Sequence, residues 1–244
     1  MAVHYGSRVD YRDISKIKSG SGWYGVAFGG EVIPLYINQD YDGGGWILVL
    51  ANRINTGGMN NLYFNDALNT ANYRTGGSAN GANTVCYPKA VIGSSLSNYN
   101  VFIGLKFWRL LSGRVTSNKM TIVQFVSPTS GMSLSGTHTK RYRWQADFFG
   151  PTFNFTSASG VSDETGTGAP GFYSYHAANS FSFSTYDQDR DAHGGNCSSY
   201  YNNNPWWYGG CWSGNYFAGN GYADGPYWDS SGSDYHNYGA VYIK

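Results

Sequence analysis

Short runs of β-branched and aromatic residues, separated by clusters of Gly, Asn and Ser, make up most of the chain before about residue 160. Runs of this kind are typical of β-strands bounded by turns, and we expect strands over residues 31–38, 46–51, 100–105 and 120–126. Residues 61–71 and 107–111 fit short helices, but no long stretch keeps the apolar period of about 3.6 residues that an amphipathic helix shows. The pattern predicts a strand-rich architecture with few helices.

The two ends of the chain depart from this pattern. From about Asp163 the hydrophobic periodicity almost disappears and Gly, Asn, Asp, Trp and Tyr dominate, a composition also found in disordered segments. Two cysteines and several tryptophans lie there, so we expect an ordered, loop-rich region that a metal or a disulfide ties together. Residues 1–22 are polar and weakly periodic, and we expect an arm or docking segment ahead of one domain over 23–244.

The composition disfavours several classes of partner. The formal net charge is +1 and charged residues are 13% of the chain, so no basic field attracts nucleic acid or an anionic membrane. No apolar run approaches the ~18 residues of a membrane helix, and the N-terminus lacks the apolar core of a signal peptide. We therefore expect neither membrane insertion nor export by a signal peptide. The 22 tyrosines and 8 tryptophans, set among Gly, Asn and Ser, instead suit surfaces that bind sugars or proteins.

Local motifs of common enzymes are missing from the sequence. The 5 histidines have no HExxH-like spacing, and neither a GxSxG elbow nor a P-loop occurs. Residues 166–171 match GxGxxG, but no apolar strand precedes them and a proline interrupts any helix start. We expect a protein that is not an enzyme.

Three carboxylates alternate along the chain at Asp187, Asp189 and Asp191. Because like charges repel, such carboxylates converge on one point only around a cation, and Ca²⁺ prefers oxygen ligands. The segment is not an EF-hand loop, because Ala192 and Ser198 occupy the sixth and twelfth positions, which require Gly and Glu. By spacing alone, a calcium loop and a solvated acidic turn both remain open.

The residues around this motif resemble a known family. Residues 183–197 (FSTYDQDRDAHGGNC), 205–211 (PWWYGGC) and 220–228 (NGYADGPYW) resemble the C-terminal half of fibrinogen-like domains, the family of fibrinogen, the ficolins and the tachylectins. Residues 42–49 (DGGGWILV) resemble the family's glycine-tryptophan strand, so the resemblance extends over about residues 13–244. It implies an α+β fold with a central antiparallel sheet, few short helices and a loop-rich, calcium-binding subdomain over about 160–244.

A calcium site is the first implication of this resemblance. The side chains of Asp189 and Asp191 take the positions of calcium ligands, and the backbone carbonyls of His193 and Gly195, with water, complete the shell. Asp187 is a nearby carboxylate outside the ligand set.

The resemblance further implies a disulfide between Cys197 and Cys211, whose second cysteine follows a cis peptide bond in the family. By count alone, 3 cysteines allow at most one bridge within the chain, which leaves Cys86 as a thiol in this pairing. The family's first disulfide has no counterpart here, and the middle region lacks the family's usual helix motif.

The acetyl-binding lectins of this family have an aromatic pocket, and the matching positions here include a tryptophan where the family often has a histidine. An acetyl methyl group gains by burial against rings, while its carbonyl and amide bind backbone groups. For any single tyrosine, a role in packing remains the open alternative. The implied ligand-binding residues are Tyr201, Trp212, Tyr222, Ala223 and Tyr235.

These observations predict an extracellular, lectin-like recognition protein that binds acetylated sugars or host-surface glycans through a pocket organised by calcium. The lack of a signal peptide and the scarcity of cysteine favour a virion protein, such as a bacteriophage tail fibre or receptor-binding appendage. Residues 1–22 would dock onto other virion proteins, and we expect a homo-oligomer, a trimer if it is built as fibres usually are. The main alternative is a structural capsid or tail decoration protein. A secreted lectin of the ficolin kind and a glycan hydrolase rank below it.

Overall fold

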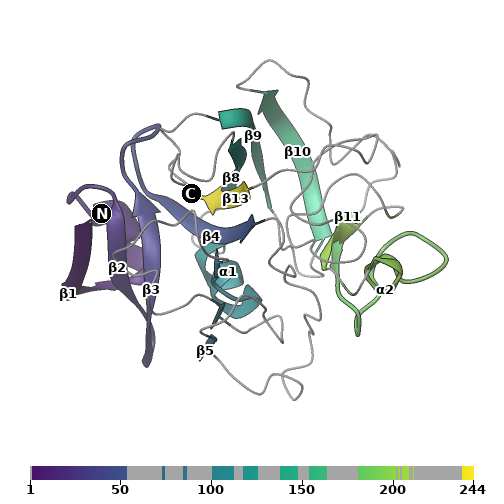
Figure 1. Cartoon of the computed structure of the whole chain (residues 1–244), viewed down its shortest axis with the longest axis horizontal. Coiled ribbons are helices and arrows are strands. Elements are labelled where there is room, and N and C mark those ends of the chain that lie inside the picture. The colour runs from purple at the N-terminus through teal and green to yellow at the C-terminus, as the bar shows by residue number, and fades with distance from the viewer. Residues whose placement is uncertain are drawn as a thin grey trace.

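The computed structural model describes residues 2–53, 73–74, 85–86, 101–112, 118–125, 138–147, 154–163, 181–201, 203, 205–208, 211 and 238–244 (Figure 1). In chain order the elements are β1 (Ala2–Asp10), η1 (Tyr11–Lys16), β2 (Gly22–Phe28), β3 (Glu31–Asn38), β4 (Trp46–Arg53), β5 (Tyr73–Arg74), β6 (Val85–Cys86), β7 (Val101–Phe102), α1 (Leu105–Ser112), β8 (Asn118–Phe125), β9 (His138–Asp147), β10 (Asn154–Asp163), β11 (Phe181–Ser184), α2 (Cys197–Tyr200), β12 (Trp206–Tyr208) and β13 (Tyr238–Ile243). No helix in these ranges is long and apolar enough to cross a membrane.

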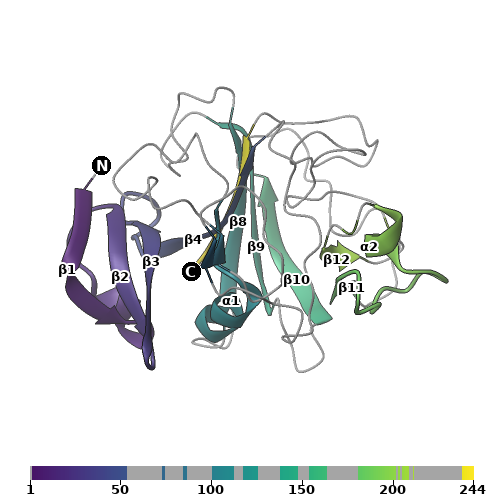
Figure 2. The same ribbon diagram turned by 60° about the horizontal axis from the view of Figure 1, so that its bottom comes forward.

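The strands follow one path of neighbours, β1-β2-β3-β4-β13-β8-β9-β10-β11-β12, and β5, β6 and β7 branch from it at β4. The pairings from β2 through to β12 along this path are antiparallel, and β1 pairs with β2 in parallel. Figure 2 shows the path running from β1 at one end of the molecule to β12 and α2 at the other. The structure thus confirms a strand-rich α+β fold with a central antiparallel sheet.

The centre of the sheet joins distant parts of the chain. Strand β13 lies between β4 and β8, with Ile243 opposite Ile47 in β4 and Val241 opposite Ile122 in β8. Residues 46–51 of β4 are all 0% exposed, which fits their nearly continuous apolar sequence, because a strand covered on both faces has no polar side. This strand anchors the hydrophobic core.

Helix α1 links the two ends of the molecule through aromatic contacts. The ring of Phe107 lies 4.8 Å from that of Phe28 in β2, and the ring of Trp108 lies 5.4 Å from that of Trp207 in β12. Lys106 and Leu110 face solvent on the same helix. The helix therefore presents one apolar face to both ends of the sheet.

Most of the elements expected from sequence are present where the structure describes the chain. Residues 31–38 form β3, 46–51 lie in β4, 107–111 lie in α1, and β8 covers 118–125 where 120–126 was expected. The strand expected over 100–105 is shorter, because Gly104 has a φ of +84° and helix α1 begins at Leu105. The helix expected over 61–71 lies outside the described residues.

The segment expected to be an arm, residues 1–22, contributes to the sheet. Its strand β1 pairs with β2, and Ile14 of η1 is 0% exposed within the core. Asp10 caps η1, where its carboxylate accepts a hydrogen bond from the backbone N–H of Arg12 at 2.9 Å. The docking role of this segment, and the domain boundary at residue 23, stay predictions.

Candidate functional site

The acidic motif lies in a compact loop that follows β11. Thr185 and Gln188 exchange backbone hydrogen bonds of 3.0 and 3.2 Å, which closes a tight turn. The Thr185 hydroxyl donates to Asp187 Oδ1 at 2.8 Å, and Arg190 N–H donates to Ser184 Oγ at 3.0 Å. Asp187 is therefore part of the turn itself.

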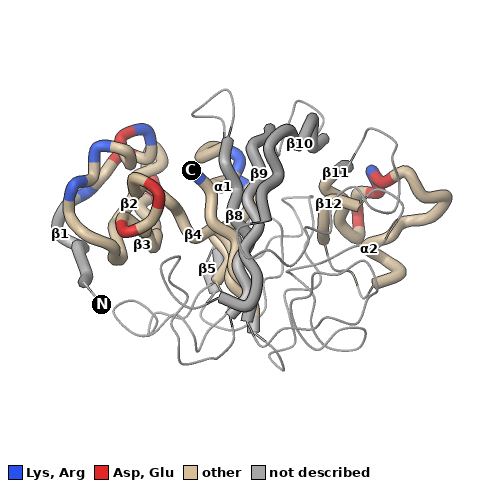
Figure 3. Tube along the Cα trace, turned by 90° about the horizontal axis from the view of Figure 1, so that it is seen from above, with Lys and Arg blue, Asp and Glu red and all other residues tan. Residues whose placement is uncertain are grey.

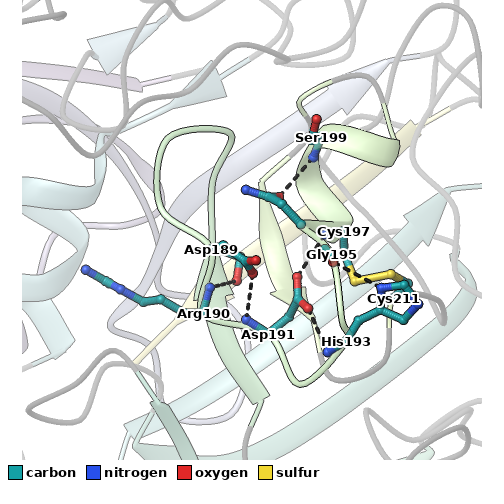
Figure 4. Close-up of a disulfide and its surroundings, with 10 residues drawn as sticks. Asp189, Arg190, Asp191, His193, Gly195, Cys197, Ser199 and Cys211 are labelled. Atoms are coloured by element: carbon teal, nitrogen blue, oxygen red, sulfur yellow. Dashed lines mark hydrogen bonds between the residues drawn. A yellow bond between two sulfur atoms is a disulfide. The ribbon is translucent and has the colours of Figure 1, made fainter.

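Asp191 is the central side chain of the acidic loop, which we define as residues 187–197. Its Oδ1 accepts the His193 N–H at 2.8 Å, and its Oδ2 accepts the Cys197 N–H at 2.9 Å. Figure 4 shows this carboxylate directed toward the backbone that leads into α2. A single side chain thus fixes the fold of the loop over six residues.

Asn196 ties the end of the loop to the two residues that precede it. Its amide nitrogen donates to the carbonyl oxygens of Thr185 and Tyr186, and its amide oxygen accepts from Ser199 N–H at 3.0 Å. The last contact is an N-cap for α2, a position where asparagine is favoured. This cap was not predicted from the sequence, although an asparagine at the start of a short helix is a recognisable N-cap signal.

A disulfide joins the start of α2 to the segment beyond β12. Cys197 and Cys211 are bonded, with their Cα atoms 5.0 Å apart. His193 lies near both sulfur atoms, but sulfurs bonded to each other are not thiolates and do not bind a metal as thiolates would. The chemistry of the donors therefore favours the carboxylates of the loop over the bonded sulfur atoms as ligands for a cation.

The carboxylates of Asp189 and Asp191 lie close enough to repel each other. Partial burial raises the pKa of Asp191, the two backbone N–H groups lower it, and the charge of Asp189 raises it further. Two carboxylates match the charge of one divalent ion, and each oxygen of Asp191 can accept more than its one N–H bond. Carboxylate and carbonyl oxygens are the kind of donor that Ca²⁺ prefers. Figure 3 shows charged residues gathered in this segment beside β11 and α2.

Aromatic side chains border the acidic loop. Tyr200 and Tyr186 are 62% and 47% exposed, and the ring of Tyr200 lies 5.9 Å from the ring of His193. In the neighbouring strands β11 and β12, Phe183 and Trp207 pack edge to face at 4.8 Å inside the core. The loop therefore combines a buried aromatic base with exposed rings that a ligand can reach.

Comparisons with known proteins relate this arrangement to one fold. Residues 137–241 match the family model of the fibrinogen beta and gamma chains, C-terminal globular domain. The chain is similar in structure to the fibrinogen-like globe domain of human ANGPTL6 (TM-score 0.61, 20% identity), with 100% of this chain and 98% of the other covered. Over residues 137–241 the chain matches a fibrinogen-like C-terminal domain, and as a whole it has the fold of one.

Two further structures are similar to this fibrinogen-like domain. The fibrinogen-like globe domain of human ANGPTL2 has a TM-score of 0.59 and 18% identity over 96% of both chains. The lamprey fibrin D-dimer in complex with the peptide ligand Gly-His-Arg-Pro-amide has a TM-score of 0.58 and 14% identity, over 98% of this chain and 74% of the other. A search of curated proteins gives no match. At these identities the similarity establishes the fold.

The structure places some of the expected site residues in this fibrinogen-like domain. Asp189, Asp191, His193 and Gly195 share the acidic loop, and the Gly195 carbonyl lies 3.0 Å from His193 Nδ1. Tyr201 is half-buried and stacks on Tyr208 with ring centroids 6.4 Å apart. The expected disulfide is present. Trp212, Tyr222, Ala223, Tyr235 and the peptide bond before Cys211 lie outside the described residues.

Proposed function

We propose that this fibrinogen-like domain is a recognition module whose acidic loop binds calcium and holds a neighbouring pocket for an acetylated sugar or another surface glycan. The observation that carries the proposal is the Asp191 carboxylate, which organises the loop through the N–H groups of His193 and Cys197 and lies beside Asp189. A divalent ion would balance the charge of both carboxylates, with carbonyls of His193 and Gly195 completing an oxygen shell.

The disulfide provides a connection from the ion to the pocket. The backbone N–H of Cys197 donates to Asp191 in the loop, and the sulfur of Cys197 is bonded to that of Cys211. The expected ligand residues Trp212, Tyr222, Ala223 and Tyr235 follow Cys211 in the sequence. Calcium bound at the loop would therefore restrain the segment that carries the ligand contacts, and removal of calcium would weaken ligand binding without a direct contact between ion and sugar.

Exposed rings support a sugar or acetyl ligand in particular. Tyr186 and Tyr200 offer faces on which the C–H surface of a sugar stacks, and polar loop groups nearby offer hydrogen bonds. The lamprey fibrin structure was determined with a peptide ligand, which is an example of small-ligand binding on this fold. The position of the domain on a bacteriophage tail fibre, and its assembly as an oligomer, are further proposals that this site does not require.

The proposal is tested first by calcium titration calorimetry. We expect one site in the wild type and an affinity at least about tenfold lower in Asp191→Asn, because the ion then loses a charged ligand. The matched control is Asp13→Asn, which removes the same charge beside Lys16 in η1. Calcium at a hundred times its dissociation constant should add about 2.7 kcal/mol to the free energy of unfolding. Equal affinities of the two variants would contradict the assignment of the ion to this loop.

Glycan-array binding with calcium and with a chelator tests the ligand. Binding to N-acetylated sugars that requires calcium and is lost in Tyr222→Ala supports the full proposal. Binding that persists in chelator removes calcium from the mechanism and leaves a glycan-binding domain. No binding across the array, with or without calcium, would favour the structural decoration protein instead.

A further inference from the structure

The histidine beside the disulfide completes a group of three possible metal ligands. A ring nitrogen of His193 and the sulfur atoms of Cys197 and Cys211 all lie within 4.8 Å of one another (Figure 4). His193 is exposed to solvent, whereas both cysteines are buried. While the two sulfur atoms are bonded to each other they are not thiolates, so what this group can bind depends on the state of that bond.

Reduction of the disulfide converts its two sulfur atoms into metal ligands. A dithiol supplies the two electrons: one of its thiolates attacks a cysteine sulfur, and its second thiolate then displaces that sulfur as the dithiol closes into a disulfide of its own. Both cysteines of the chain end as thiols. A zinc ion binds the two thiolates and releases their two protons. Two thiolates and one imidazole are a donor set that suits Zn²⁺, whereas Ca²⁺ prefers oxygen.

The spacing of the three ligand atoms suits a tetrahedral zinc ion. With Zn–S bonds of about 2.3 Å and a Zn–N bond of about 2.0 Å, tetrahedral angles place the ligand atoms roughly 3.5–3.8 Å apart. The three atoms here lie within 4.8 Å, and the Cα atoms of the two cysteines are 5.0 Å apart. Rotations of the freed cysteine side chains therefore bring all three atoms to the distances that the ion requires.

The imidazole of His193 is oriented by its own loop. Its Nδ1 lies 3.0 Å from the Gly195 carbonyl oxygen, and its ring meets the ring of Tyr200 edge to face at 5.9 Å. When Nδ1 carries the proton, it donates to that carbonyl and Nε2 keeps a lone pair for an ion. A metal-bound histidine usually donates its other ring N–H to a carbonyl or carboxylate in this way.

Cys197 is positioned by contacts that do not involve its sulfur. Its backbone N–H donates to Asp191 Oδ2 at 2.9 Å, and its carbonyl oxygen accepts the Tyr201 N–H at 3.1 Å. The backbone N–H of His193 donates to the same Asp191 carboxylate, through Oδ1. Two of the three ligands thus belong to one segment whose hydrogen bonds reduction leaves intact, and an ion has only to recruit Cys211.

Cys211 depends on a restraint to stay in this group. Its φ of +86° lies in the left-handed region, which a residue other than glycine rarely occupies unless its surroundings impose it. In the oxidised chain the bond to Cys197 is one such restraint. A metal ion bound to both sulfur atoms would act in its place after reduction.

We propose that the reduced chain binds Zn²⁺ through Cys197, Cys211 and His193, with water from the exposed side of the histidine as the fourth ligand. The ion makes the connection between the acidic loop and the segment beyond β12 that the disulfide makes in the oxidised chain. A disulfide oxidant, which takes up two electrons, re-forms the Cys197–Cys211 bond and releases the ion. The site goes beyond the proposed function, because its donors are side-chain nitrogen and sulfur and not the oxygens assigned to calcium.

Zinc titration of the reduced and the oxidised chain, in buffer free of calcium, tests the proposal. We expect one zinc ion per reduced chain and at least about tenfold weaker binding to the oxidised chain, because the disulfide withholds two of the three protein ligands. Zinc should also raise the melting temperature of the reduced chain and leave that of the oxidised chain unchanged. Equal affinities, or no rise in the melting temperature of the reduced chain, would overturn the proposal.

Variants locate the ion to these residues. In the reduced chain, His193→Ala should weaken zinc binding at least about tenfold, because it removes a ligand and keeps the backbone N–H that Asp191 accepts. The matched control His4→Ala removes a histidine from β1, at the other end of the molecule, and should bind zinc as the wild type does. Cys86→Ser, which removes the third cysteine of the chain, should also bind normally. Equal losses in the two histidine variants, or a loss in Cys86→Ser, would reject the site.

Cobalt(II) reports the ligands directly, because each Co–S bond adds near-ultraviolet absorption and a tetrahedral site adds visible bands. We expect both features in the reduced chain and neither in the oxidised chain. Cys211→Ser should lose at least about half of the near-ultraviolet absorption, since one of two thiolates is gone. Excess Ca²⁺ should not displace the cobalt, so this result is independent of the calcium proposal. Full absorption in Cys211→Ser, or bands in the oxidised chain, would contradict the assigned ligands.

Discussion

At the scale of single residues, side chains that bond to the backbone determine the shape of the loops. Asp191 accepts two N–H groups of its own loop, and Gln39 accepts one from the β3–β4 turn. Asn196 both closes the acidic loop and caps α2. These bonds have short sequence separations, but no periodic pattern in the sequence predicts them. They give the β3–β4 turn and the acidic loop a defined structure.

Two glycines with similar φ angles differ in the space around a substituted side chain, so they distinguish the cost of backbone strain from the cost of a steric clash. Gly29 and Gly44 have φ values of +64° and +74°, but a Cβ meets nothing within 4 Å at Gly29 and meets Gln39 at Gly44. We expect Gly29→Ala to lower the free energy of unfolding by about 1–2 kcal/mol, from the left-handed conformation alone. Gly44→Ala should cost at least about 1 kcal/mol more, because Gln39 must move. Equal losses in urea denaturation would contradict the role of Gln39.

Asp10 allows a pH prediction at the same scale. Its paired hydrogen bonds to Arg12 lower its carboxyl pKa to about 2. Because the folded-state pKa is below the ordinary value of about 3.8, the pair contributes stability above pH 3.8 that is lost as the pH falls toward 2. Carboxyl titration by nuclear magnetic resonance should show this low midpoint, which returns toward the ordinary value in Arg12→Gln. The control Lys16→Gln should leave the Asp10 midpoint unchanged.

At the scale of elements, short strands and helices depend on links that lie outside their own hydrogen bonds. Strand β12 has only three residues and α2 only four, and neither would be stable alone. The disulfide from Cys197 to Cys211 joins the two regions, and β12 pairs with β11 through Phe183 and Trp207. Recognition of the cysteine pair came from resemblance to a family, since the count of cysteines left other pairings open.

Removal of the disulfide measures this link. For a closed loop of roughly 15 residues, the double variant Cys197→Ser/Cys211→Ser should lower the free energy of unfolding by about 3 kcal/mol. The sequence separation of the bonded cysteines is 14. A reductant should destabilise the wild type to a similar extent and leave the double variant unaffected in thermal unfolding. A further loss in the double variant would show that the reductant acts elsewhere.

At the scale of the whole molecule, a single core connects the N-terminal strands to the disulfide-linked region. Buried residues from β2, β4, α1, β12 and β13 form one cluster. Trp108 is 0% exposed and contacts Trp207, while its neighbour Phe107 contacts Phe28. We infer that the described parts of the fold unfold together, because their buried side chains form one continuous cluster.

Two substitutions in one helix test this coupling. Trp108→Ala should lower the free energy of unfolding by about 3–5 kcal/mol, because it leaves a cavity between α1 and β12. Leu110→Ala, at a position that is 41% exposed in the same helix, should change it by less than about 0.5 kcal/mol. Denaturant midpoints followed by fluorescence and by circular dichroism should coincide in the wild type. Separate midpoints would contradict a single cooperative core.

The sequence by itself determined the local elements and the chemical character of the site. Continuous or β-branched apolar runs predicted β3 and β4, because the residues of a strand that will be buried are apolar in the sequence. The alternating carboxylates at Asp187, Asp189 and Asp191 specified an acidic loop, and the family resemblance supplied the fold that the comparisons bear out.

Only the tertiary structure decided how distant segments meet. Strand β13 pairs with β4 across nearly the whole chain, residues 2–10 form a sheet strand where an arm was expected, and Lys244 reaches the turn after β3. Such contacts depend on which apolar faces bury each other, and sequence periodicity specifies that a face is apolar without specifying its partner. A cavity of about 500 Å³ could not be predicted for the same reason, since its lining comes together only when η1, the β3–β4 turn and the residue after β13 pack side by side.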